Sequence, residues 1–251
     1  MPLSEQIGLE DIPGDQAIWR FLDRRKLSDL TSSGSLRLSR ISELRKLDQR
    51  ESRLPSVIRE VLQRFSLNED GTAFVDEMLK ACEDQAFDTF ASCWFLPGTR
   101  EEELRMWQEF GGGNEGGVRI SSTLRCLLSS LPTNGRRLFG IGHVRYIRDD
   151  ISYPEVLALG QYHSMPFLLK LEDHINEREI RLFERFRLPQ MHWDVRQEQP
   201  PCTRFRIADT NLIGSIGISP MCSSAIVQDI TDELMQWRFP RTLIEVNAGT
   251  N

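Results

Sequence analysis

The chain lacks the features that would place it in a membrane or outside the cell. Residues 1–18 hold no basic stretch followed by an apolar run, so no secretory signal is predicted. No window approaches the roughly 18 uninterrupted apolar residues that a membrane-spanning helix needs. The five cysteines are odd in number and widely spaced, which favours reduced thiols over a disulfide framework. These absences predict a cytoplasmic protein with no membrane partner.

Signatures of metal, phosphate and nucleophile chemistry are also missing. No two cysteines have C-x-x-C spacing, and the four histidines show neither ligand spacing nor a fixed acidic partner, so no metal is expected. The glycine-rich segment 111–117 lacks both the Lys-Ser/Thr of a P-loop and G-x-G-x-x-G spacing, and it is predicted to be a connector. No G-x-S-x-G elbow is present. A formal charge of -6 argues against a broad electrostatic grip on nucleic acid.

The composition that remains is typical of a globular protein, and its apolar spacing predicts both strands and helices. Hydrophobic residues make up 39% and charged residues 27% of 251 residues. Apolar alternation and short apolar runs predict strands at 17–22, 35–39, 87–95, 117–122, 138–147, 177–186, 205–209 and 212–218. Helical spacing predicts helices at 26–32, through 41–85, and at 101–110, 123–131, 155–162, 167–174 and 225–237.

This order of elements predicts an α+β fold. We expect a single domain over residues 1–251, with a central, mostly antiparallel sheet that could be split, and with flanking helices. A helical insertion is expected at about 42–85, and a C-terminal helix at about 225–237.

Six short segments, taken in order, carry a family resemblance. They are Ile18-Trp19-Arg20-Phe21, Leu47-Asp48-Gln49-Arg50-Glu51, Ser92-Cys93-Trp94-Phe95, Met106-Trp107-Gln108-Glu109-Phe110, Gly117-Val118-Arg119-Ile120-Ser121-Ser122-Thr123 and Glu177-Arg178-Glu179-Ile180-Arg181. Together they resemble the bacterial family catalogued as domain of unknown function 2971 (DUF2971), over roughly residues 17 to 220. The chain departs from the family pattern at Phe110, where a Tyr is common, and at Trp19-Arg20, where Tyr-Lys is common.

The order of these segments more distantly resembles the ADP-ribosyltransferase fold, a split sheet that binds NAD. The resemblance implies NAD as a substrate. It also implies that Arg20 anchors the dinucleotide, that Ser121 or Ser122 orients it, and that a late-strand glutamate assists the departure of nicotinamide.

The residue types suit that chemistry. Breaking the nicotinamide–ribose bond develops positive charge on the ribose, which a carboxylate stabilises. Glu177 and Glu179 are two apart on a predicted strand, so their side chains are expected on one face as the catalytic pair. Arg20 could pair with pyrophosphate through a bidentate fork, and Trp107 offers a ring for stacking. Ser121 and Ser122 should point to opposite faces, so at most one can face the cleft.

Each assignment has a structural alternative. The two glutamates, with Arg178 and Arg181, could form an exposed charge ladder. Arg20 could be a salt-bridge partner, Trp107 could be core, and the Ser-Ser-Thr run could cap the following helix.

Three functions therefore stay open. The first is an NAD-consuming, ADP-ribosyltransferase-like transferase with a macromolecular acceptor, of the toxin or phage-defence kind. The second is a non-catalytic module that binds a nucleotide or a partner protein, and the third is a nucleic-acid-processing enzyme.

Overall fold

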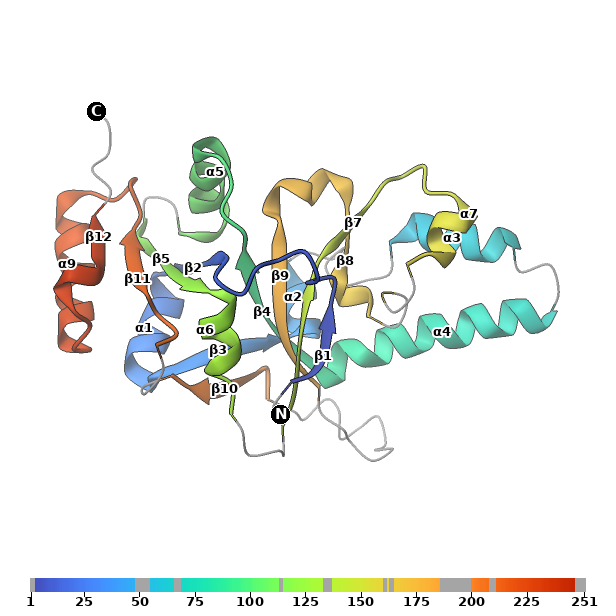
Figure 1. Cartoon of the computed structure of the whole chain (residues 1–251), viewed down its shortest axis with the longest axis horizontal. Coiled ribbons are helices and arrows are strands. Elements are labelled where there is room, and N and C mark those ends of the chain that lie inside the picture. The colour runs from blue at the N-terminus through green and yellow to red at the C-terminus, as the bar shows by residue number, and fades with distance from the viewer. Residues whose placement is uncertain are drawn as a thin grey trace. The chain divides into compact units, whose positions relative to one another are not determined.

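The computed structural model describes residues 3–47, 55–65, 69–112, 115–132, 137–159, 162, 165–185, 200–207 and 211–246. The fold is α+β, as predicted, with helices and a mostly antiparallel mixed sheet (Figure 1). The chain forms two compact units, each assembled from three separate stretches. Unit 1 comprises Met1–Leu9, Leu38–Ser92 and Asn134–Thr203, and unit 2 comprises Glu10–Arg37, Cys93–Thr133 and Arg204–Asn251. The single domain expected from the sequence stays a prediction.

Strands β1 (Leu3–Ile7), β6 (Leu138–His143), β9 (Glu179–Arg185) and β4 (Thr89–Phe95) follow one another in that order, β4 contributing its residues up to Ser92 to unit 1. β1 pairs parallel with β6, and β6 pairs antiparallel with β9. β3 (Ser35–Arg40) pairs antiparallel with β4 and also pairs with β10 (Cys202–Arg206). β7 (Arg145–Ile147) and β8 (Leu169–Leu171) pair in parallel as a separate two-stranded sheet. The helix α7 (Tyr153–Leu157) lies between these two strands in the sequence.

Three helices fill the segment where a helical insertion was predicted. They are α2 (Ile41–Leu47), α3 (Ser56–Phe65) and α4 (Glu69–Asp88). In the sequence they connect β3 to β4, two strands that pair with each other. α3 buries Ile58 and Val61, three residues apart, which is the spacing of one helix face. Because α4 continues to Asp88, β4 begins two residues after the predicted strand start at 87.

Two predictions in unit 1 were wrong in ways that bear on the site. The predicted helix 167–174 is instead the 3₁₀ helix η3 (Pro166–Leu168), the strand β8 and the start of the 3₁₀ helix η4 (Glu172–Glu177). The predicted strand 177–186 begins only at Glu179. The reason is Arg178, whose left-handed backbone (φ 46, ψ 51) ends η4 and prevents the strand from starting earlier.

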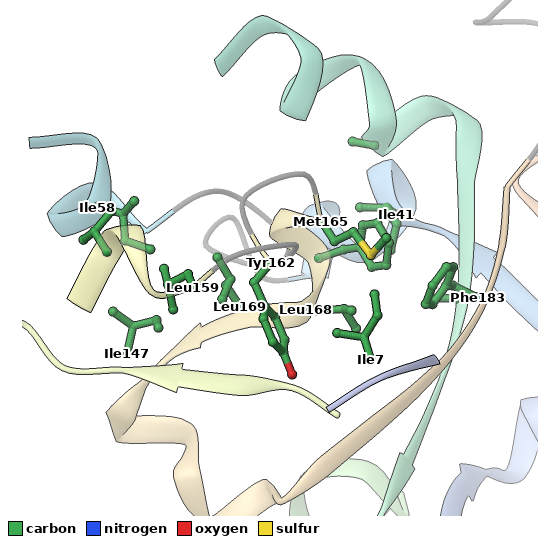
Figure 2. Close-up of a cluster of buried hydrophobic side chains, with 14 of the residues drawn as sticks. Ile7, Ile41, Ile58, Ile147, Leu159, Tyr162, Met165, Leu168, Leu169 and Phe183 are labelled. Carbon is green, nitrogen blue, oxygen red and sulfur yellow. The ribbon is translucent and has the colours of Figure 1, made fainter. Parts of the chain in front are cut away.

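The core of unit 1 gathers apolar side chains from elements far apart in the chain. Figure 2 shows Ile7, Tyr162, Leu168 and Phe183 among them. Leu168 and Ile7 are fully buried, and each side chain of this kind stabilises the fold by roughly 1.5–3 kcal/mol. The Tyr162 hydroxyl also donates a hydrogen bond to the carbonyl oxygen of His143 at 3.2 Å.

Unit 2 is ordered β2 (Ala17–Asp23), β5 (Gly117–Thr123), β11 (Ser215–Ile218) and β12 (Ile244–Val246), the first three antiparallel and the last added in parallel. Its helices are α1 (Arg24–Ser33), α5 (Arg100–Phe110), α6 (Leu124–Ser129) and α9 (Ser224–Gln236), with the 3₁₀ helix η5 (Arg241–Leu243) before β12. Figure 1 shows α9 beside β11 and β12.

Candidate functional site

Glu177 and Glu179 come from different elements but their carboxylates converge on one lysine. Glu177 is the last residue of η4 and Glu179 is the first of β9, so the predicted shared strand face is wrong. The Nζ atom of Lys170, on β8, lies 2.6 Å from Oε2 of Glu177 and 3.0 Å from Oε2 of Glu179. The left-handed turn at Arg178 thus brings the two carboxylates together by a route that strand alternation does not foresee.

Glu179 is held from two sides by cations. Arg181 donates from Nε to Oε1 at 2.7 Å and from Nη2 to Oε2 at 2.9 Å, and its Nη1 donates to the carbonyl oxygen of Phe167 at 2.5 Å. The side chains of Arg181 and Glu179 are 0% and 1% exposed. A charged pair therefore exists here, as one alternative predicted, but it is buried and joins residues two apart on one strand instead of forming an exposed ladder.

Tyr146, on β7, also contacts this cluster. The backbone N–H of Glu179 donates to Tyr146 Oη at 2.9 Å. Burial, with the nearby Glu179 carboxylate, raises the pKa of Tyr146. The hydroxyl consequently stays protonated and keeps its O–H donor at any physiological pH.

Glu177 forms the outer side of the cluster with His174. Nδ1 of His174 lies 2.9 Å from Oε1 of Glu177, and Nε2 lies 3.5 Å from an exposed carboxylate oxygen of Asp173. Exposure rises outward, from 1% at Glu179 to 8% at Glu177, 12% at Lys170 and 27% at His174. The accessible edge of the cluster is therefore the imidazole, backed by Glu177.

The expectation that no histidine has a fixed acidic partner was wrong for His174. In a 3₁₀ helix residues three apart lie directly above one another, so His174 and Glu177 face each other in η4. The His-x-x-Glu spacing was the available signal. His143, by contrast, lies on β6 opposite Ile180 of β9. Burial, and to a smaller extent the positive charge of Arg178, lowers the pKa of His143. His163 and His192 lie outside the described residues.

The four residues predicted to bind the cofactor lie in unit 2, and they fall on both faces of its sheet. In the β2–β5 register Ile18 is opposite Ser122 and Trp19 is opposite Ser121. Because side chains alternate along a strand, Arg20 shares a face with Ser122, and Phe21 shares the other face with Ser121. Trp107 packs edge-on against Phe21, with ring centroids 4.9 Å apart, and so belongs with Ser121.

Trp107 has the structural role that its alternative predicted. Its side chain is 1% exposed and lies in a core cluster with Phe21, Phe95 and Met106. At that exposure the indole offers no ring surface to a ligand.

Arg20 and the serines have mainly structural contacts. Nη2 of Arg20 donates to the carbonyl oxygen of Arg37 at 2.9 Å, its guanidinium lies 6.0 Å from the centroid of Trp94, and burial lowers its pKa to about 10. The cap of α6 is Thr123, whose Oγ1 accepts from Cys126 N at 3.1 Å. Ser122 is buried and donates weakly to the carbonyl oxygen of Thr123, while Ser121 is partly exposed.

The site is therefore described within unit 1 alone, as the acid–base cluster of Tyr146, Lys170, His174, Glu177, Glu179 and Arg181. Within the described ranges, no three His, Cys, Asp or Glu side chains are grouped so that they could hold a metal ion. In the same part of the chain, no helix has the length and apolar character needed to cross a bilayer. The chain matches no protein-family model, no curated protein and no solved structure.

Proposed function

We propose that the chain is an NAD-consuming enzyme of the ADP-ribosyltransferase type, related to the DUF2971 family, with the acid–base cluster as its active site. One observation carries the proposal: two carboxylates meet at one lysine, beside an imidazole that opens to solvent. A cytoplasmic enzyme of this kind would act as a toxin or a phage-defence effector, either by depleting NAD or by modifying a macromolecule.

Glu177 is the carboxylate proposed to face the ribose. Among the described residues, Lys170 donates to Oε2 and His174 contacts Oε1, and a carboxylate oxygen can accept two hydrogen bonds. A ribose hydroxyl could therefore be added without displacing either partner. As the nicotinamide bond lengthens, the Glu177 charge stabilises the positive charge that develops on the ribose.

Glu179 is proposed as a positioning residue. Its oxygens already accept from both Arg181 and Lys170, and it is almost fully buried. Its role would be to fix Lys170, which in turn fixes Glu177.

The test is nicotinamide release from NAD, followed by chromatography, with cell lysate added to supply acceptors. We expect release by the wild-type chain and a loss of about 10²–10³-fold in Glu177→Gln, a magnitude typical of removing one transition-state contact. Glu172→Gln is the matched control, because Glu172 is an exposed carboxylate on the same 3₁₀ helix. Circular dichroism verifies that each variant is folded. A wild-type chain that neither releases nicotinamide nor binds NAD would refute the proposal.

A non-catalytic nucleotide- or partner-binding module is the second candidate. It is favoured by the pairing of Glu179 with Arg181 and Lys170, which commits one of the two carboxylates to structural contacts. Titration calorimetry separates the two functions, because a binding module would bind NAD or ADP-ribose without releasing nicotinamide.

A further inference from the structure

His174 and Glu177 form a carboxylate–imidazole pair with a fixed orientation. The contact is made by Nδ1, which leaves Nε2 on the side where the cluster opens. Lys170 holds the other carboxylate oxygen at 2.6 Å, so Glu177 cannot swing away without breaking a buried ion pair. The ring is held while its second nitrogen is presented outward.

A carboxylate at Nδ1 selects the tautomer of a neutral imidazole. Glu177 accepts a hydrogen bond, so Nδ1 must carry the hydrogen and Nε2 must keep its lone pair. An imidazole in this state can accept a proton at Nε2, and the adjacent carboxylate stabilises the cation that forms.

The charges around this ring come from every element that packs near it. Asp173 and Glu177 lie on η4 itself, Lys170 comes from β8, Tyr146 from β7, and Glu179 and Arg181 from β9. Lys170 and Arg181 are already matched by Glu177 and Glu179. Among the described residues, Nε2 is in contact with Asp173, which is 56% exposed and could yield its place to an incoming group.

We propose that His174 is the general base that activates the acceptor in the reaction proposed above; the inference rests on that proposed function. The acceptor class is an O–H nucleophile, either water or a hydroxyl of a macromolecule. The pattern of paired glutamates in the sequence does not indicate His174 or a role for it as a base.

In the proposed step, Nε2 takes the proton of the acceptor O–H group, and the acceptor oxygen forms a bond to C1′ of the ribose. The bond from C1′ to the nicotinamide nitrogen breaks, and its electron pair leaves with that nitrogen, which becomes neutral. The products are nicotinamide, the ADP-ribosylated acceptor and a proton on His174, which returns to solvent.

The first experiment needs no NAD. Long-range ¹H–¹⁵N spectra of the full chain with labelled histidine report which ring nitrogen carries the hydrogen, and His174→Gln assigns the signal. We expect neutral His174 to be protonated at Nδ1. In Glu177→Gln the amide oxygen should stay on Lys170 and the NH₂ should face the ring, so the hydrogen should move to Nε2. A wild-type ring protonated at Nε2 would overturn the inference, whatever the chain does to NAD.

The second experiment measures nicotinamide release by His174→Ala and His174→Gln. We expect both to lose about 10²–10⁴-fold in rate while keeping the wild-type affinity for NAD, and we expect added imidazole to restore release in His174→Ala only. Glu172→Gln should match the wild type. Wild-type release that persists in both His174 variants would overturn the inference and leave the proposed function standing. A wild-type chain that releases no nicotinamide would overturn both.

Discussion

At the scale of single residues, Glu177 and Glu179 differ in their partners and burial, and therefore in their proposed roles. The Glu179 carboxylate is bound by a fully buried arginine and by Lys170, whereas Glu177 shares Lys170 with a partly exposed histidine. Removing either carboxylate takes a counter-charge from Lys170, but only the loss of Glu179 also leaves a fully buried arginine without its counter-charge. The two glutamates should therefore be separable by experiment.

We expect Glu179→Gln to destabilise the fold by about 3–5 kcal/mol, because Arg181 would then hold a buried charge without a full counter-charge. Urea unfolding followed by circular dichroism measures the change in the free energy of unfolding. Glu43→Gln is the control, since Glu43 pairs with an exposed lysine and should change stability by no more than about 0.5 kcal/mol. Equal stability losses in the two variants would show that the Arg181–Glu179 pair does not stabilise the fold.

Contacts between single residues also explain why most of the acid–base cluster could not be predicted from the sequence. Glu177 and Glu179 attract attention as neighbours in the chain, but Lys170 and Tyr146 reach them through β8 and β7. Those contacts depend on a left-handed Arg178, and non-glycine residues adopt that backbone rarely. Trp107 illustrates a second difficulty, because the sequence of an amphipathic helix does not distinguish an aromatic residue in the core from one that contacts a ligand.

At the scale of elements, close approach of backbone explains one of the glycines. A Cβ at Gly117 would overlap the carbonyl oxygen of Gly111 and lie 2.5 Å from that of Leu22, so the end of α5 can meet β2 and β5 only if residue 117 has no side chain. At Gly217, on the neighbouring strand β11, the atoms nearest to a built Cβ belong to the Arg119 guanidinium and begin at 3.5 Å. Two glycines in paired strands thus have unlike surroundings.

We expect Gly117→Ala to destabilise the fold by about 1–3 kcal/mol or more, because backbone atoms must shift to admit the methyl group. Gly217→Ala is the matched substitution and should change the free energy of unfolding by less than about 1 kcal/mol, since the nearest Arg119 atoms lie at ordinary van der Waals distance from the new methyl group. Thermal or urea unfolding of the pair decides this. A Gly117→Ala variant as stable as Gly217→Ala would contradict the packing described for the end of α5.

Elements with their own local signals were predictable, and elements formed by distant pairing were not. α5 begins with a capping box between Thr99 and Glu102 and was predicted within one residue. β1 reads Leu-Ser-Glu-Gln-Ile, which has no strand pattern, and it is a strand because it pairs in parallel with β6. β8 alternates Leu169 and Leu171, but the apolar run from Pro166 obscures that period.

At the scale of the whole molecule, the chain passes between the two units five times, after Leu9, Arg37, Ser92, Thr133 and Thr203. Neither unit is a continuous stretch. β6 and β9 of unit 1 and β11 and α9 of unit 2 all lie after residue 133. No single cut therefore separates a complete unit from the rest of the chain.

We expect a fragment of residues 1–133 to lack a cooperative unfolding transition and near-ultraviolet circular dichroism, because both units would miss their last stretch. The full chain, measured at the same concentration, is the reference. A sigmoidal urea transition in the fragment would show that one unit folds without its third stretch.

This interleaving also sets conditions for synthesis on the ribosome. At about 5–20 residues per second, a chain of 251 residues takes roughly 10–50 s to complete, and domains usually fold one after another as they emerge. Here β6, the partner of β1, is translated only after residue 137, and β5, which pairs with β2 along its length, only after residue 116. Until then the nascent chain carries unpaired strand edges, so its yield in cells should depend on chaperones more strongly than its length suggests.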